Sequence, residues 1–342
     1  MTDFRTRLLA AAALILSAGL ADAQAPYLIS TFAGGLPTPT AAAGNTYAIP
    51  QATAVATDLF GNVYLSAANN CVFRLDLNGN LSRVAGNGVA GYTGDQGSAV
   101  NAELNGPQGL AVDIHGNVYI ADQNNQVIRK VTPAGTITTV AGTGTAGYNG
   151  ASGQGTGIQL NFPRGLAADP AGNLYIADRA NNLVRMLSPN GALTTVAGTH
   201  LSGMSGDGGP ATSATLDGPA SLALDPAGNL YIGDASYQVR KVNPGGIISH
   251  IAGTGVYGES GDGGAAASAQ LSYPSGLAVD SVGNLYIADD YNLLVRKVSA
   301  SGTITVYAGG GASFANGIPA NQARLSNVLG VAVQYNGNLF IA

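Results

Sequence analysis

The sequence has few charged residues. Asp, Glu, Lys and Arg together make up 10% of its 342 residues, and the net charge is −5, whereas about a quarter of the residues are charged in typical globular domains. Nucleic-acid affinity comes mainly from Lys and Arg contacts to phosphates. Several of the 14 Lys and Arg recur at one repeat position instead of forming a patch. The composition therefore argues against a nucleic-acid partner.

Cysteine is almost absent as well. Cys71 is the only one, so no disulfide can form within the chain. Because Cys71 begins an apolar segment, it is expected to be a buried and unreactive side chain.

Residues that could form a catalytic site are also scarce. The three histidines, His115, His200 and His250, fall in a strand turn, a long loop and a fourth strand, so they do not converge as zinc ligands do. No Gly-x-Ser-x-Gly nucleophile motif occurs. Each glycine loop carries one carboxylate, too few for Ca²⁺, which takes about six to eight oxygen ligands. We therefore expect no catalytic residue, metal or cofactor, with Ca²⁺ left open as an alternative.

The N-terminus has the composition of a secretory signal peptide. Arg5 and Arg7 precede the apolar run Leu8–Leu20, which is followed by Ala21-Asp22-Ala23. The run is shorter than the ~20 apolar residues of a membrane span. We predict cleavage after Ala23 and a secreted or periplasmic chain, residues 24–342, with no membrane span. An uncleaved anchor is the alternative.

The most prominent feature of the sequence is a repeat. A Gly-Asn element returns at intervals of 54–56 residues. It occurs at Gly61-Asn62, Gly116-Asn117, Gly172-Asn173, Gly228-Asn229, Gly283-Asn284 and Gly337-Asn338. A fixed period of this size indicates stacked or radially arranged copies of one unit. No single copy can bury its apolar faces alone, so the array is the folding unit.

Each copy contains four short apolar runs separated by turn residues. In the second copy the runs are Gly109–Asp113, Val118–Asp122, Val127–Val131 and Ile137–Ala141. β-Branched residues and Tyr dominate them, as in strands. Four antiparallel strands repeated radially form a propeller blade. The absence of Trp and the longer period exclude a propeller of Trp-Asp repeats.

The repeated segment Pro-x-Gly-Leu-Ala-Val-Asp-x-x-Gly-Asn-Leu-Tyr-Ile-Ala-Asp-x-x-Asn-x-x-Val-Arg-Lys-Val closely resembles the NHL repeat. It occurs at Pro107–Val131, Pro163–Leu187, Pro219–Val242 and Pro274–Val298, with a divergent copy at about Pro50–Leu75 and a cut-off copy at about Val328–Ala342. The resemblance implies an all-β, six-bladed propeller with repeats at about 50–86, 107–142, 163–198, 219–253, 274–309 and 328–342. Members of this family include protein-binding, RNA-binding, sensor and lyase domains, and the lyases use His ligands that have no counterpart here.

The two ends of the chain suggest how the ring closes. Tyr27–Gly34 matches a fourth strand, and Leu329–Gln334 and Leu339–Ala342 match a first and a second strand. Together they supply three strands of a sixth blade, which removes a free sheet edge. The third strand is missing, which predicts a gap between Ala342 and Tyr27–Gly34. We favour a chain cut short relative to its gene over a defective blade. A five-bladed ring with a displaced tail is the alternative.

An Asp at the end of each second strand and an Arg in the third strand recur together. The predicted pairs are Asp122 with Arg129, Asp178 with Arg185, Asp234 with Arg240, and Asp289 with Arg296. Because the pairs follow the repeat, we interpret them as structural. In the first copy Ala67 replaces the Asp while Arg74 is retained, which leaves Arg74 without a partner. Asp95, Asp207 and Asp262, in the long glycine loops, are expected to cap a helical turn.

The connections from second to third strand and from fourth to next first strand share one side of a propeller, here called the loop face. This side is rich in Asn and Tyr, which suit recognition surfaces. The candidate ligand-binding residues are Asn70, Tyr92, Asn124, Asn125, Tyr148, Asn181, Asn182, Tyr237, Tyr257, Asp290 and Tyr291.

We therefore predict a monomeric, non-enzymatic propeller that binds a protein, peptide or glycan. One alternative is a lyase or lactone hydrolase with a metal in its central channel. Another is a structural or sensor module of a longer envelope protein.

Overall fold

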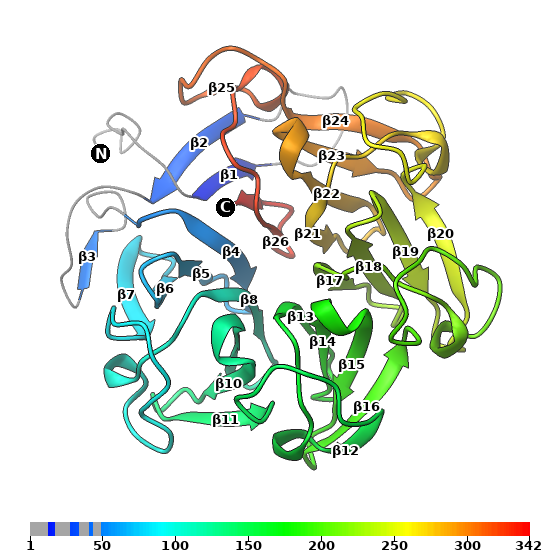
Figure 1. Ribbon diagram of the computed structural model, residues 1–342. Helices are drawn as coiled ribbons and strands as arrows, with labels where there is room; N and C mark the ends of the chain where they lie inside the picture. Colours follow the sequence, from blue (N-terminus) through cyan, green and yellow to red (C-terminus); the bar gives the residue numbers. More distant parts are fainter. Residues whose placement is uncertain (1–12, 18–27, 34–40, 44–48) are drawn as a thin grey trace.

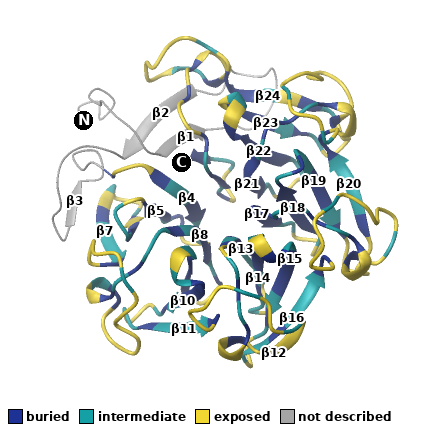
Figure 2. Cartoon of the chain, in the orientation of Figure 1, coloured by how far each residue is buried: buried dark blue, intermediate teal, exposed yellow. Residues whose placement is uncertain are grey.

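The computed structural model describes residues 13–17, 28–33, 41–43 and 49–342 (Figure 1). Its sheets are arranged radially around a central channel, and the most buried strands lie toward the centre (Figure 2). The prediction of an all-β propeller is confirmed. In the part of the chain that is described, no helix is long and apolar enough to cross a membrane.

Five blades contain four antiparallel strands each, with consecutive strands paired. They are β4 (Ala52–Thr57), β5 (Val63–Ala67), β6 (Cys71–Leu75) and β7 (Asn80–Ala85); β8 (Pro107–Val112), β9 (Val118–Asp122), β10 (Val127–Val131) and β11 (Ile137–Ala141); β13 (Pro163–Ala168), β14 (Leu174–Asp178), β15 (Leu183–Leu187) and β16 (Ala192–Ala197); β17 (Ser221–Leu224), β18 (Leu230–Asp234), β19 (Gln238–Val242) and β20 (Ile248–Ala252); and β21 (Pro274–Val279), β22 (Leu285–Asp289), β23 (Leu294–Val298) and β24 (Ile304–Gly309). Two short outer strands, β3 (Ala41–Ala43) and β12 (Ser152–Gln154), pair with β7 and β16.

Short 3₁₀ helices occupy the connections of the loop face. In three blades a 3₁₀ helix follows the second strand: η3 (Gln123–Asn125), η5 (Arg179–Asn181) and η8 (Asp290–Asn292). The others lie in the long connections between blades: η2 (Ala99–Asn101), η4 (Gly155–Gly157), η6 (Ala211–Ser213), η7 (Ala266–Ser268) and η9 (Ala320–Gln322).

The repeated Gly-Asn element closes the turn between the first and second strands. In the second blade, Oδ1 of Asp113 accepts hydrogen bonds from the backbone N–H groups of His115 and Asn117, both at 2.9 Å. Oδ2 accepts from Nδ2 of Asn117 at 2.7 Å and from the hydroxyl of Tyr119 at 3.2 Å. Gly116 has a φ of +77°, which favours glycine. The turn thus uses Asp, Gly, Asn and Tyr at fixed spacing, and this explains why the motif returns along the chain.

The apolar core lies between blades. One cluster joins Tyr119 and Ile128 of the second blade to Leu166 and Ile176 of the third. The other clusters are built in the same way from neighbouring sheets. Because each blade is covered by the next one, burial of the apolar faces requires the whole array.

Glycines allow the inner strands to approach one another closely. A Cβ on Gly109 would lie 1.8 Å from the carbonyl oxygen of Arg164, and one on Gly165 would lie 2.8 Å from that of Ala220. A Cβ on Gly276 would lie 2.7 Å from Cα of Gly330. The central channel, with a volume of about 250 Å³, is therefore bounded by contacts between backbones.

A sixth sheet differs from the five regular blades. Its strand order is β25 (Ile318–Pro319), β2 (Leu28–Ala33), β1 (Ala13–Ser17), β27 (Leu339–Ile341) and β26 (Val331–Val333). Six blades were predicted, the sixth incomplete and closed by the N-terminal strand; the structure has five blades of four antiparallel strands. The expected gap beside Ala342 is also corrected, because β1 lies between β27 and β2 and pairs with both. An apolar segment, Ala-Leu-Ile-Leu-Ser, thereby pairs two otherwise open strand edges.

Removing residues 1–23 tests this sheet, because β1 lies inside the predicted signal peptide. We expect faster amide hydrogen exchange at Leu339–Ile341, which lose their pairing with β1. Exchange at Ile137–Ala141, in a complete blade, should stay unchanged and serves as the internal control. Equal protection of Leu339–Ile341 in the full and shortened chains would show that another strand takes the place of β1.

Candidate functional site

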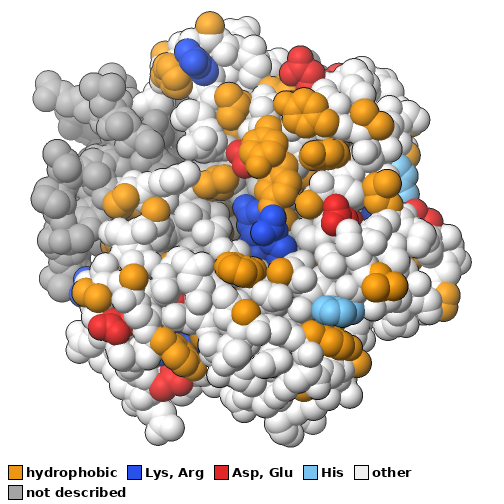
Figure 3. All heavy atoms as spheres, in the orientation of Figure 1, with side chains coloured by type: hydrophobic (Ala, Val, Ile, Leu, Met, Phe, Trp, Pro, Cys, Tyr) orange, Lys and Arg blue, Asp and Glu red, His pale blue; other side chains and the backbone are white. Residues whose placement is uncertain are grey.

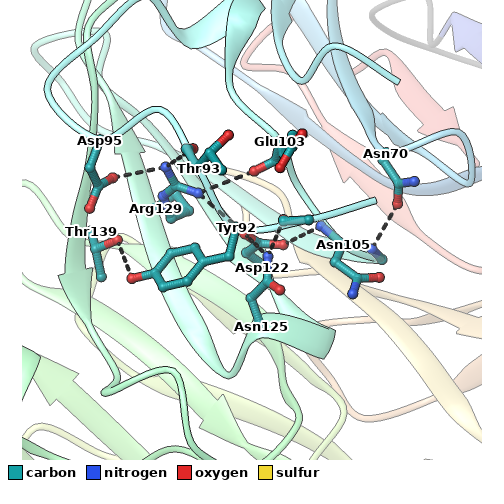
Figure 4. A network of polar contacts seen from close by, with 12 residues as sticks. Asn70, Tyr92, Thr93, Asp95, Glu103, Asn105, Asp122, Asn125, Arg129 and Thr139 are labelled. Atoms are coloured by element: carbon teal, nitrogen blue, oxygen red, sulfur yellow. Dashed lines mark hydrogen bonds and ion pairs between the residues drawn. The ribbon is translucent and has the colours of Figure 1, made fainter. Parts of the chain in front are cut away.

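Buried arginines join each of four blades to the long loop that covers it. In the second blade, Nη2 of Arg129 donates to Oδ1 of Asp95 at 2.8 Å and to the carbonyl oxygen of Thr93 at 3.1 Å. Nη1 of Arg129 lies 3.5 Å from Oδ2 of Asp122, and both side chains are fully buried. Figure 4 shows this guanidinium between the third strand and the loop residues. Arg129 therefore holds the loop face in place.

The same arrangement recurs with variations. The Arg185–Asp178 and Arg296–Asp289 pairs lie 3.6 and 3.5 Å apart. Nη2 of Arg240 donates to Asp207 at 2.8 Å, as Arg129 does to Asp95. Asp234 differs from its counterparts, because it accepts from the backbone N–H of Ser236 at 3.1 Å and forms no ion pair with Arg240. The predicted pairing of Asp234 with Arg240 is thus replaced by two separate contacts.

Two expectations about these residues need correction. Asp95 and its counterparts Asp207 and Asp262 bind buried arginines, and the 3₁₀ helices that follow them have no side-chain cap. In the first blade, Phe73 pairs with Leu65 as Arg129 pairs with Ile120. Phe73, and not Arg74, therefore occupies the arginine position. An apolar Phe73 beside Ala67 replaces the ion pair there.

Burial shifts the pKa values of the carboxyl groups in this network. It raises the pKa of Asp234 to about 6, although hydrogen bonds from Ser236 and the charge of Arg240 act in the opposite direction. Burial likewise raises the pKa values of Asp122 and Asp178 to about 6. Asp225 in the fourth blade behaves differently. Burial would raise its pKa, but the hydrogen bonds from Asn229 and Tyr231 outweigh burial and lower it.

These shifts predict opposite pH dependences for two variants of one blade. A raised pKa means that the folded chain holds a proton that the unfolded chain has released, so that stability falls as the pH rises from about 4 to 6. Between pH 4.5 and 6.5, wild type should therefore lose on the order of 1–2 kcal/mol relative to Asp234→Asn. For Asp225→Asn the sign reverses, since a lowered pKa gives stability that is lost as the pH falls. Urea unfolding at pH 4.5 and 6.5 measures the difference for Asp234→Asn, and unfolding at about pH 3, below the ordinary pKa of Asp, measures the difference for Asp225→Asn. The same sign for both variants would contradict the assignment.

Most of the predicted asparagines hold the loop face together. Nδ2 of Asn125 donates to the carbonyl oxygen of Gly91 at 2.7 Å and to Asp122, and Asn181 makes the equivalent contacts. Oδ1 of Asn70 and Oδ1 of Asn182 accept backbone N–H groups of the following blade, both at 2.9 Å. Asn124 donates to Asn105 at 3.1 Å. These amides stabilise the surface, and their role in ligand binding stays a prediction.

The predicted tyrosines fall into two groups. Tyr92 and Tyr148 cover the buried Arg129 and Arg185, with the guanidinium carbons 5.2 and 5.9 Å from the ring centres. Tyr148 also stacks on His200. In the second group Tyr257, 57% exposed, packs edge-on against the half-buried Tyr237, and Tyr291, 64% exposed, stacks on Tyr273 at 5.5 Å. The more exposed rings suit contact with a ligand.

One position at the channel mouth breaks the repeat. The inner strands present Thr53, Gln108, Arg164, Ala220, Ser275 and Leu329 at equivalent places. Arg164 is the only charged side chain among the residues that line the channel. Its Nη1 donates to the hydroxyl of Tyr273, and its Cζ lies 5.3 Å from the centre of the same ring.

Two aromatic residues beside Arg164 have a backbone conformation that favours glycine. In the second to fifth blades the residue before the proline that opens the repeat has positive φ, and it is Gly106 in the second blade and Gly218 in the fourth. The third and fifth blades place Phe162 (φ +51°) and Tyr273 (φ +72°) there. A bulky residue at such a φ is strained, and strain of this kind clusters at functional sites.

Two more residues of the mouth differ from their counterparts. Arg179 begins η5, where other copies have Ala68, Gln123, Ala235 and Asp290. Its Nε is buried without a hydrogen-bond partner in the structure. Asp290 is 8% exposed, and its Oδ1 accepts the backbone N–H of Val328 at 3.3 Å.

We call Phe162, Arg164, Arg179, Tyr273, Asp290 and Tyr291 the mouth cluster. The sequence pointed to Asp290 and Tyr291 and missed the other four residues. An alignment of the six copies for charged or aromatic residues at Gly or small positions would have identified them.

Metal ligands are not grouped anywhere in the described residues: three or more His, Cys, Asp or Glu side chains do not come together in a geometry that could hold an ion. The predicted channel metal therefore gains no ligand set from this part of the chain. Arg164 would moreover repel a divalent cation in the channel.

Radial four-stranded sheets around a narrow channel, with a non-repeating cluster at one mouth, define a β-propeller with a candidate binding site. The NHL-repeat family matches residues 160–185, and the teneurin NHL domain matches residues 68–149. Teneurin-1 of Mus musculus is 33% identical over 278 residues, which are 70% of this chain and 10% of that protein. The chain belongs to the NHL-repeat propellers, as its motifs predicted, and spans about a tenth of the length of the teneurins it matches.

Solved structures with the same fold have different activities. An auxiliary nutrient binding protein from Bacteroides ovatus superposes with a TM-score of 0.66 at 15% identity, covering 93% of this chain and 77% of that one. A gluconolactonase from Xanthomonas campestris superposes with a TM-score of 0.56 at 14% identity, covering 92% and 89%. At such identities the likeness shows the fold alone.

Proposed function

We propose that this propeller is a recognition module that binds a protein or peptide on its loop face, centred on the mouth cluster. The observation that supports it is the break in the repeat at one place. Arg164, Tyr273 and Phe162 stand where the framework needs only small or flexible residues, and two of them are strained. A structural role would follow the repeat, as the buried arginines do.

Figure 3 supports a binding site at the mouth cluster. Lys or Arg atoms gather at the centre of this face, and hydrophobic side chains surround them. Mixed aromatic and arginine surfaces of this kind carry much of the binding energy in protein interfaces. The enzymatic alternative, a lyase or lactone hydrolase with a channel metal, gains no group of metal ligands among the described residues.

A peptide array and a glycan array test the proposal, with wild type compared to a Tyr291→Ser variant. We expect peptide ligands whose binding falls at least about tenfold in Tyr291→Ser, the loss expected for an aromatic hot spot. Val282→Ser is the matched control, because Val282 is 72% exposed in the turn between β21 and β22 on the opposite face. Ligands that depend equally on both positions, or no ligand at all, would contradict the proposal. If only glycans bind, the ligand class is carbohydrate and not peptide.

We further propose that the chain is exported and monomeric; cleavage after Ala23 would remove β1 from the sixth sheet. The basic start, apolar run and small-residue site at Ala21-Asp22-Ala23 support export. Mass spectrometry of extracellular or periplasmic material should then find Gln24 at the N-terminus, and an intact Met1 in the cytosol would contradict it. Light scattering should give the mass of a single chain.

A further inference from the structure

Arg164 and Arg179 carry the positive charge of the mouth cluster, and neither forms an ion pair in the part of the chain that the structure describes. The arginines of the repeat each lie within 4 Å of an Asp carboxylate. For Arg164 the structure shows a hydrogen bond to a neutral hydroxyl, that of Tyr273. Oδ1 of Asp290 accepts the N–H of Val328. Burial raises the pKa of Asp290, and the charge of Arg164 acts in the opposite direction.

The two arginines belong to the same end of one blade. Pro163 and Asp178 are partners in the register of β13 and β14, and Arg164 and Arg179 are the residues that follow them. Both therefore lie where β13 meets the loop face. A guanidinium has five N–H donors. Nη1 of Arg164 donates to Tyr273, and Nε of Arg179 is buried without a partner. N–H donors that are buried and have no hydrogen-bond partner favour an anionic acceptor.

The surroundings limit what the anion can be attached to. Backbone contacts at Gly109 and Gly165 keep the channel narrow, so only a slim group can enter the channel beside Arg164. Outside it, Phe162 and Tyr291 expose 42% and 64% of their surfaces, and Leu293 exposes 39%. A ligand that fits carries a slim anionic group next to an apolar side chain.

We propose that the mouth cluster binds a carboxylate of a peptide, which enters the channel mouth and accepts charge-assisted hydrogen bonds from Arg164 and Arg179. The neighbouring apolar side chain of the peptide lies on Tyr291 and Phe162. A peptide is favoured over a uronic-acid glycan because a chain end or an acidic side chain is slimmer than a sugar ring. This inference rests on the proposed function and names its ligand chemistry.

The test uses biotinylated random hexapeptide pools and biolayer interferometry. One pool is made without Asp and Glu and has a free C-terminal carboxylate, and the second is identical but ends in a carboxamide. A third ends in a carboxamide and contains Asp and Glu, and a biotinylated glucuronate tetrasaccharide is the glycan arm. We expect wild type to bind a carboxylate-bearing pool at least about tenfold more tightly than the neutral pool, as a charge-assisted contact implies. The first and third pools distinguish a chain end from an acidic side chain.

Variants assign the effect to the site. Arg164→Ala and Arg179→Ala should each reduce the preference for carboxylate at least about fivefold, and Arg164→Lys should restore part of it, since lysine keeps the charge but lacks the planar fork. Arg324→Ala is the matched control, because Arg324 is exposed and lies over Phe314. Circular dichroism melting confirms that each variant is folded.

Equal binding of the neutral and acidic pools, an unchanged preference in Arg164→Ala, or binding of the glucuronate alone would overturn the inference. If neutral peptides bind and still depend on Tyr291, the proposed function survives and only the carboxylate is wrong. If no pool binds and the arrays reveal no ligand, both fail.

Discussion

Replacing Arg296 with methionine should lower the free energy of unfolding by about 3–5 kcal/mol, the usual cost of breaking a buried ion pair from one side. Arg296 is fully buried, and its Nη1 and Nη2 lie 3.5 Å from Asp289 and 2.9 Å from Asp262. Its loss leaves the buried Asp289 without a cation and detaches the loop that carries Asp262. Urea unfolding followed by circular dichroism measures the change. Lys297→Met is the control, with an expected loss of at most about 1 kcal/mol for its contacts with tyrosine rings.

The first blade supplies a natural compensating variant. There Ala67 and Phe73 occupy the positions of Asp289 and Arg296, and Phe73 is 2% exposed. The double variant Asp289→Ala/Arg296→Phe should therefore be more stable than Arg296→Met, because an apolar pair can replace a buried ion pair at little net cost. If the losses of the two single substitutions simply add, the two side chains do not interact.

Gly109→Ala should destabilise the ring by about 3 kcal/mol, at the upper end of what overpacking usually costs. The added methyl carbon would lie 1.8 Å from the carbonyl oxygen of Arg164 and 2.9 Å from its carbonyl carbon. These are backbone atoms of the next inner strand, so two blades must move apart. Since Arg164 moves with its backbone, binding of the carboxylate pool should weaken as well.

Gly157→Ala is the matched control for this substitution. Gly157 lies in η4, and a Cβ there would meet no atom within 4 Å. Its φ is not in the positive range, so alanine is tolerated and the melting temperature should stay within about 2 °C of wild type. A melting temperature for Gly109→Ala equal to that of Gly157→Ala would show that the inner strands can separate without loss.

The repeat made the blades predictable because each strand is specified locally. Asp113, Gly116 and Asn117 close a turn by contacts within five residues, and such contacts are visible in a sequence. The pairing of β1 with β27 joins residues at opposite ends of the chain. No local pattern in Ala13–Ser17 distinguishes that partner from any other edge, and for this reason a gap was predicted where a strand lies.

The site was harder to predict for a related reason. Asp95 lies 34 residues from Arg129, so its role follows only from how the loop folds back over the blade. Arg164 forms no motif with its sequence neighbours. It becomes informative when the ring brings it next to Tyr273, which lies 109 residues further along the chain.

The backbone contacts around the channel have a consequence for how specificity can change. Because Gly109, Gly165 and Gly276 fix the spacing of the inner strands, the diameter of the ring does not depend on the side chains that project into its mouth. Gln108, Arg164, Ala220 and Leu329 can then be exchanged separately, whereas the hydroxyls of Thr53 and Ser275 donate to backbone carbonyls of the next blade and belong to the scaffold. Moving the arginine to Gln108, with threonine at 164, should rotate the ligand about the ring axis and leave the scaffold intact.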